Sequence, residues 1–160
     1  MGLNELKEQD LRGKIWFMPT DTIPGISALY GDTQSLERIY NVKRRERSKP
    51  VITLCADLGQ LTSVIGRALS NEEQRIIDSV SGRPTTVIID EIPIRIVSEP
   101  EIVRVLQEIG PLYSTSCNRA GEGALLLPED AKKEFGEELD FYVEYKLEEG
   151  VASTIIKIIR

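Results

Sequence analysis

The chain has 160 residues, of which 41% are hydrophobic and 29% charged; this is the composition of an ordinary globular protein and excludes disorder as its main state. Its length predicts one domain over residues 1–160. With 20 Lys and Arg against 26 Asp and Glu the net charge is −6, and the absence of histidine excludes Ser–His and Cys–His catalysis and histidine-ligated metal sites.

Helical and strand patterns alternate along the chain, and hydrophobic periodicity separates them. In chain order they predict a short amphipathic helix with Leu3, Leu6 and Leu11 that ends at Gly13, strands over 14–18 and 26–30, a helix with Leu36, Ile39 and Tyr40, a strand over 51–55, helices with Leu58–Ile65 and Ile76–Val80, strands over 85–89 and 92–97, a helix that ends before Gly110, a strand over 112–115, a helix over 129–135, and strands over 140–145 and 153–159. We therefore expect an α/β protein with a mixed, twisted sheet.

Several boundaries carry local signals. Asp57 precedes an apolar helix as an N-cap, and Ser70 with Glu73 has the spacing of a capping box. The strands over 85–89 and 92–97 are separated by Asp90-Glu91, which predicts a hairpin.

The two cysteines, Cys55 and Cys117, are far apart and too few for a Cys-only zinc site or a disulfide framework. No apolar run approaches the ~20 residues that cross a bilayer. The first residues lack the basic and apolar regions of a secretory signal. These features favour a reducing, cytoplasmic location.

Positive charge is concentrated between Lys43 and Lys49, where five basic residues and one acid give a local charge of +4. A solvated charged run is one interpretation. However, the stretch lies between a predicted helix and a predicted strand and Pro50 follows it directly, which indicates a structured loop. We therefore interpret it as a candidate phosphate site.

Four polar segments, 19–25, 43–50, 114–121 and 150–154, are each expected to follow a strand, where open α/β sheets hold their ligands. Singly, their side chains could just as well support turns. Neither a P-loop nor a dinucleotide fingerprint is present. Arg95 lies within the apolar strand over 92–97, so an inward-pointing side chain needs an anion, whereas the alternative is exposure or pairing with an acid such as Glu91.

Five ordered motifs make the chain similar to the YrdC-like threonylcarbamoyl-adenylate synthases, and the similarity spans about residues 14–156. The motifs are Pro19 to Ile26, Lys43-Arg44-Arg45 with Lys49-Pro50, Ile94-Arg95, Ser116-Cys117-Asn118 and Gly150 to Ile155. The resemblance implies a twisted, open α/β sheet with a deep cationic cavity. It also implies that L-threonine, bicarbonate and ATP react to give threonylcarbamoyl-AMP and pyrophosphate, which a separate transferase complex uses in the t6A modification of tRNA.

The resemblance also assigns roles by motif. Arg45, Lys49, Ser116 and Asn118 correspond to the ATP side, with Lys43 and Arg45 as the catalytic cations, and Thr20, Thr22, Arg95, Ser114 and Ser153 correspond to the threonine side. Cationic and hydrogen-bonding groups suit the negative charge that gathers during attack on the α-phosphate. No carboxylate cluster indicates a protein-held metal, and Mg²⁺ is expected from the chemistry of ATP.

Some features depart from the family pattern and keep alternatives open. Pro24 stands where the family usually has a tyrosine, which leaves open other carbamoyl-adenylate chemistry. Arg83 adds a cation either near the site or only at the surface, and Arg160 could replace a nucleotide-contacting arginine of longer relatives. An RNA-binding role for the basic stretch is disfavoured by the net charge of −6 and by the single aromatic neighbour, Tyr40.

Overall fold

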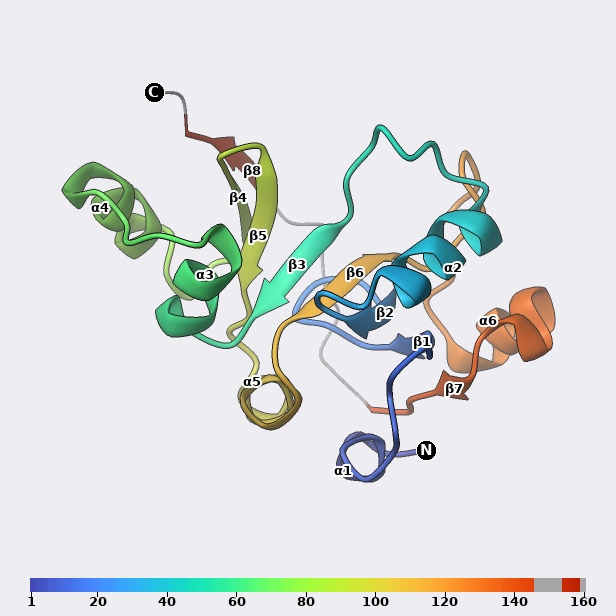
Figure 1. The fold of residues 1–160 in the computed structure, drawn as a ribbon. Coiled ribbons are helices and arrows are strands. Elements are labelled where there is room, and N and C mark those ends of the chain that lie inside the picture. Colours follow the sequence, from blue (N-terminus) through green and yellow to red (C-terminus); the bar gives the residue numbers. More distant parts are fainter. Residues whose placement is uncertain (146–153, 159–160) are drawn as a thin grey trace.

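The computed structural model describes residues 1–145 and 154–158. Its strands form one mixed sheet with the order β7-β1-β2-β6-β3-β5-β4-β8, and helices cover both faces (Figure 1). The strands are β1 Trp16–Met18, β2 Gly25–Leu29, β3 Ile52–Cys55, β4 Thr85–Ile89, β5 Ile92–Ile96, β6 Leu112–Ser116, β7 Phe141–Tyr142 and β8 Thr154–Lys157. The helices are α1 Leu3–Leu6, α2 Thr33–Lys43, α3 Leu58–Ile65, α4 Asn71–Ser79, α5 Pro100–Ile109 and α6 Pro128–Phe135, followed by a 3₁₀ turn, Gly136–Glu138.

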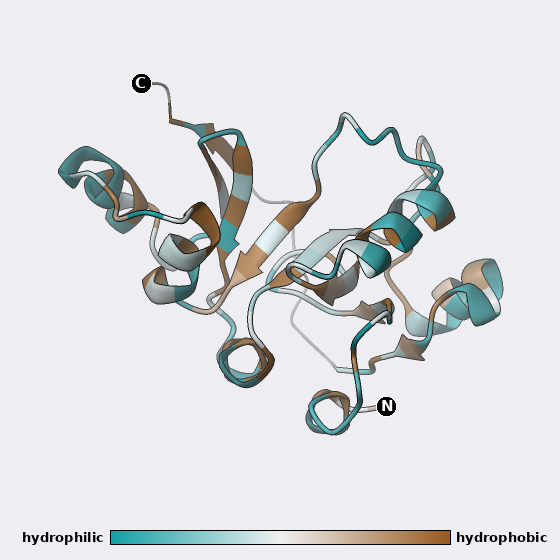
Figure 2. Cartoon of the chain, viewed as in Figure 1, coloured by the Kyte–Doolittle hydropathy of each residue, from teal (hydrophilic) through white to brown (hydrophobic). Residues whose placement is uncertain are grey.

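Alternation along the strands assigns the helices to the two faces. Trp16 and Met18 pack with α1 and α5, whereas Phe17 between them packs with α2 and α6. In β3, Leu54 faces α5 and Cys55 faces α3 and α4. Strand β5 instead carries isoleucines on the face of α3 and α4 and more polar residues between them, which gives its banded colouring in Figure 2. The apolar core is thus divided between the two faces of the sheet.

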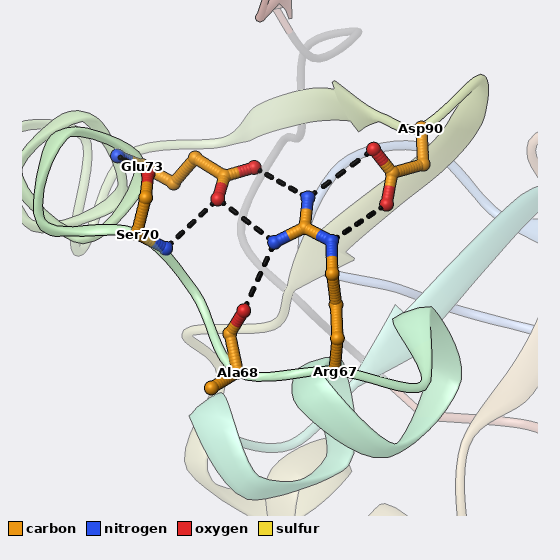
Figure 3. A network of polar contacts seen from close by, with 5 residues as sticks. All are labelled: Arg67, Ala68, Ser70, Glu73 and Asp90. Atoms are coloured by element: carbon orange, nitrogen blue, oxygen red, sulfur yellow. Dashed lines mark hydrogen bonds and ion pairs between the residues drawn. The ribbon is translucent and has the colours of Figure 1, made fainter.

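The local signals are confirmed. Asp57 accepts a hydrogen bond from the Gln60 amide, and Ser70 and Glu73 form both halves of a capping box. Strands β4 and β5 pair antiparallel, with Val87 opposite Ile94. The Arg67 guanidinium holds this hairpin against the α3–α4 connection, because it donates to both carboxylates of Glu73 and Asp90 at 2.8–3.2 Å and to the carbonyl of Ala68 (Figure 3).

Three expectations from the sequence need correction. The first helix covers only residues 3–6, because the chain then turns toward β1. Strand β7 has two residues rather than six, although Val143 and Glu144 still donate to the carbonyls of Phe17 and Met1. The polar segment 43–50 begins at the end of α2 and precedes β3, so it does not follow a strand.

Candidate functional site

A cavity of about 270 Å³ lies on the sheet face that α5 covers in part, where β2, β5 and β6 meet the loop between β1 and β2. It is lined by Thr22, Ile23, Gly25, Arg45, Pro50, Val51, Ile52, Arg95, Ser114, Thr115, Ser116 and Ile155. Ser114 and Ser116 share the face of β6 that carries the core residue Leu112, because side chains two apart in a strand point the same way. Small polar residues therefore replace apolar ones at this end of the strand.

Gly25 allows the two central strands to approach at the cavity wall. It pairs with Ser116 in the β2–β6 ladder. A Cβ atom at this position would lie 2.7 Å from both the Ser114 hydroxyl and the Thr115 carbonyl, so any larger residue would push the strands apart. The close approach places strand backbone and serine hydroxyls together at the cavity wall.

A second hollow of about 240 Å³ adjoins the first. Its lining consists of Lys43, Arg44, Arg45, Glu46, Lys49, Ser116, Asn118, Ala120 and Gly121. Because Arg45 and Ser116 line both hollows, the two hollows lie next to each other. The sequence motifs around residues 20, 45, 95 and 116 are thus brought together in space, as their joint occurrence predicts.

The side chains of the basic stretch 43–49 make different contacts, and not all of them face the hollows. Arg45 donates to the carbonyls of Lys49 and Pro50 at 3.1 and 2.9 Å, which closes the loop on itself beside the two hollows. Arg47 instead points to Glu37 and Asn41 on the exposed side of α2. The cationic lining of the second hollow therefore comes from Lys43, Arg44, Arg45 and Lys49.

Lys43 is more deeply buried than its place in a charged run indicates, with only 2% of its surface exposed. Its ammonium donates to the Ser116 carbonyl and to Asn118 Oδ1, both at 2.6 Å, and lies 3.4 Å from the Ser116 hydroxyl. Burial, and to a smaller extent the neighbouring positive charge of Arg45, lower the pKa of Lys43 to about 8. Lys43 thus holds the segment with Ser116 and Asn118 in place.

Arg95 points inward, as the apolar strand predicts, and is 5% exposed. Its partner is neither solvent nor Glu91: Nε lies 3.1 Å from Oδ1 of the buried Asp21, and Nη2 lies 3.5 Å from the Thr20 hydroxyl. Desolvation lowers the pKa of Arg95, and the adjacent Asp21 charge opposes that shift. Thr20 and Thr22 are buried, with their hydroxyls 3.1 Å apart.

Two residues of the site were missed by reasoning from the sequence. Asp21 lies inside a recognised motif, but its pairing with Arg95 joins positions 74 residues apart and has no local signal. Arg119 is 9% exposed, pairs with Glu134 and Glu138, and lies over the Phe135 ring at 4.4 Å. It anchors the segment after β6 to α6 and thereby supports Asn118.

Several predicted residues fall elsewhere or cannot be placed. Ser153 and Arg160 lie outside the described residues. Arg83 lines a different, mainly apolar cavity of about 320 Å³ between α3, α4, β4 and β5, so it is not part of this site. Cys55 and Cys117 are buried thiols, and burial raises the pKa of each to about 12.

In residues 1–145 and 154–158, no three Cys, Asp or Glu side chains gather in a way that could hold a metal ion. Within the same ranges, no helix is both long and apolar enough to cross a membrane.

Comparison with known proteins finds relatives along almost the whole chain. The model of the Sua5/YciO/YrdC family, described as telomere recombination, matches residues 10–160. A putative threonylcarbamoyl-AMP synthase of Methanocaldococcus jannaschii is 34% identical over 167 residues, which cover 98% of this chain and 80% of the relative. A threonylcarbamoyl-AMP synthase of Pseudoalteromonas translucida is 27% identical over 163 residues, covering 91% of this chain and 87% of the relative.

Solved structures share the fold at low identity. The P. abyssi Sua5 protein in complex with L-threonine superposes with a TM-score of 0.84 at 20% identity over 98% of this chain. This chain spans 50% of that protein's length. The E. coli YciO structure gives a TM-score of 0.83 at 20% identity, with 99% of this chain and 84% of YciO covered. The arrangement of sheet and helices is therefore that of a known fold.

Proposed function

The chain belongs to the Sua5/YciO/YrdC family, and on that premise we propose that it is a threonylcarbamoyl-AMP synthase. It would join L-threonine, bicarbonate and ATP to give threonylcarbamoyl-AMP and pyrophosphate. Curated relatives with this name support the proposal, as does the L-threonine bound by a protein of the same fold.

The observation that carries the proposal is the pair of adjoining hollows that share Arg45 and Ser116. The first offers the Arg95 guanidinium beside hydroxyl groups, which suits an amino acid that carries both a carboxylate and a hydroxyl. The second offers several cations beside amide and hydroxyl groups, which suits a polyphosphate. Substrates bound in both would meet at Arg45 and Ser116.

The chemistry divides into two steps in this scheme. The threonine amine forms a C–N bond to the bicarbonate carbon with loss of water, which gives an N-carboxylate. An oxygen of that carboxylate then bonds to the α-phosphorus of ATP, the bond from this phosphorus to the bridging oxygen breaks, and pyrophosphate leaves with the electron pair. Negative charge builds on the phosphate oxygens, and fixed cations stabilise it without any imidazole.

We assign the residues accordingly. Arg95 binds the threonine carboxylate, and Thr22 and Ser114, which line the same hollow, contact the amino acid. Thr20, whose hydroxyl lies 3.1 Å from that of Thr22, and Ser153, which lies outside the described residues, keep the threonine-side role that their motifs give them. Arg45 and Lys49 contact the phosphates, with Ser116 and Asn118 on the nucleotide. Because the Lys43 ammonium is already bound to Ser116 and Asn118, we assign its effect on catalysis to the placement of these two residues.

Mg²⁺ is expected to enter with ATP, because this ion is commonly bound through substrate phosphates. We further propose that the product passes to a tRNA threonylcarbamoyl transferase complex in the cytoplasm, where t6A is made.

ATP–pyrophosphate exchange measured with bicarbonate, with and without L-threonine, tests the proposal. We expect exchange that needs threonine and that falls roughly 100-fold in Arg95→Met, because a doubly hydrogen-bonded carboxylate loses its partner. Arg104→Met is the matched control, since Arg104 is exposed on α5 and pairs only with Glu101 among the described residues; it should leave exchange unchanged.

Two other results would contradict the assignment. Equal exchange without threonine would indicate a relative that makes a plain carbamoyl-adenylate. Tight RNA binding with a steep salt dependence and no effect of ATP would instead indicate an RNA-binding module.

A further inference from the structure

Asp21 is a buried carboxylate placed directly behind the arginine of the amino-acid hollow. Its side chain is 4% exposed, and its ion pair is formed with Nε of Arg95 at 3.1 Å. Within the described residues neither carboxylate oxygen makes a hydrogen bond of good geometry. Arg95 lines the hollow, whereas Asp21 is not among its lining residues.

The atom that Asp21 contacts decides how Arg95 can be used. A guanidinium carries five N–H donors, one on Nε and four on the two terminal nitrogens. Asp21 contacts Nε, and among the described residues the terminal nitrogens make only the weak 3.5 Å contact from Nη2 to the Thr20 hydroxyl. With Nε occupied by Asp21, the two terminal nitrogens remain as an edge that can bind a carboxylate through two parallel hydrogen bonds.

The loop that carries Asp21 is fixed on both sides of it. The Thr20 hydroxyl donates to the carbonyl of Ile23 at 2.7 Å and accepts from the amide of Thr22 at 3.1 Å. Both threonines are buried. Asp21 is therefore held at a defined place against Arg95 rather than being a mobile counter-ion.

We propose that Asp21 is a positioning residue for amino-acid binding. It orients the Arg95 guanidinium so that both terminal nitrogens present themselves to the substrate carboxylate, and it does not touch the substrate. This inference rests on the proposed function, in which Arg95 binds the carboxylate of threonine.

Charge repulsion alone and orientation of Arg95 predict opposite effects of Asp21→Asn on threonine binding. If Asp21 acted only through its charge, it would repel a second carboxylate near Arg95, and Asp21→Asn would tighten threonine binding. If it acts by orienting Arg95, the same variant weakens threonine binding.

The test compares Asp21→Asn with the wild type in threonine-dependent ATP–pyrophosphate exchange. We expect the KM for threonine to rise roughly tenfold or more, because one charge-assisted contact that fixes the guanidinium is lost. The KM for ATP should change less than twofold. Asp10→Asn is the matched control, since it removes the exposed carboxylate of the Asp10–Arg12 ion pair and should change neither constant. An unchanged or lowered KM for threonine in Asp21→Asn would overturn the inference.

A thermodynamic cycle with Arg95→Met separates orientation from a general loss of folding. In the Arg95→Met background, Asp21→Asn should cause no further loss of threonine binding. It should also raise the unfolding temperature, because it removes a buried carboxylate that has lost its cation. Additive losses would contradict the inference. If Asp21→Asn alone does not fold, Asp21→Glu keeps the charge but moves the guanidinium, and it should again raise only the KM for threonine.

Failure of the proposed function would look different. A folded wild type without threonine-dependent exchange overturns the function and the inference with it, whereas an active wild type with an unaffected Asp21→Asn variant overturns the inference alone.

Discussion

Lys43 is the side chain whose surroundings differ most from those expected in a charged loop. It is nearly fully buried, and close acceptors on Ser116 and Asn118 bind its ammonium, while burial lowers its pKa to about 8. In the unfolded chain a lysine titrates near 10.4. Below about pH 8 the residue is charged in both states, so the full desolvation cost opposes folding.

The stability difference between the wild type and Lys43→Met should therefore depend on pH. As the pH rises from 8 toward 10.5, the folded state releases a proton that the unfolded state keeps, so the contribution of Lys43 to stability becomes more favourable. In urea unfolding, we expect the free energy of unfolding of the wild type to rise relative to that of Lys43→Met by roughly 2–3 kcal/mol between pH 7 and 10.

Lys133→Met is the control for that measurement, because Lys133 is exposed on α6. It should leave the pH dependence of the wild type unaltered. A difference between the wild type and Lys43→Met that stays constant over this pH range would contradict the account.

The sequence indicated that Arg95, if it points inward from its apolar strand, needs an anion, and the structure shows that it does point inward. The identity of its partner could not be predicted, because Asp21 reaches it only through the order of strands in the sheet. The burial of Lys43 could not be predicted either. Five basic residues lie close together in the sequence, and only the fold shows that the one at the end of α2 is buried.

At the scale of helices and strands, elements with local signals were predicted well. The caps at Asp57 and Ser70 and the β4–β5 hairpin depend on residues within a few positions of one another. The extents of α1 and β7 were overestimated because both lie at the edge of the fold. Their ends are set by contacts with distant segments, such as the bond from the Glu144 amide to the Met1 carbonyl.

The Arg67 cluster in Figure 3 gives a test at this scale. Arg67→Met removes the donors that join Glu73 on α4 to Asp90 in the β4–β5 turn, and the Glu73 side chain is only 3% exposed. We expect a lower unfolding temperature, with the KM for threonine within twofold of the wild type, because Arg95 lies near the opposite end of β5 from this turn.

Arg75→Met on the exposed side of α4 provides the comparison, since this arginine contacts only the Asn71 carbonyl among the described residues. The account fails if Arg75→Met destabilises the protein as much as Arg67→Met does.

For the whole molecule, the central feature is that segments far apart in the sequence meet at one site. Residues from the β1–β2 loop, the α2–β3 loop, β5 and β6 line two hollows that share Arg45 and Ser116. The joint occurrence of polar motifs predicted a common site, but the strand order that brings β5 and β6 to either side of β3 is a property of the complete sheet. No local pattern in the sequence specifies that order.

A crystal structure of this chain with L-threonine and a non-hydrolysable ATP analogue tests this convergence most directly. The account predicts the threonine carboxylate on the terminal nitrogens of Arg95 and the triphosphate beside Arg45 and Lys49, with the amino group and the α-phosphate facing each other near Ser116. Threonine or nucleotide bound away from Arg95 and Arg45 would contradict it.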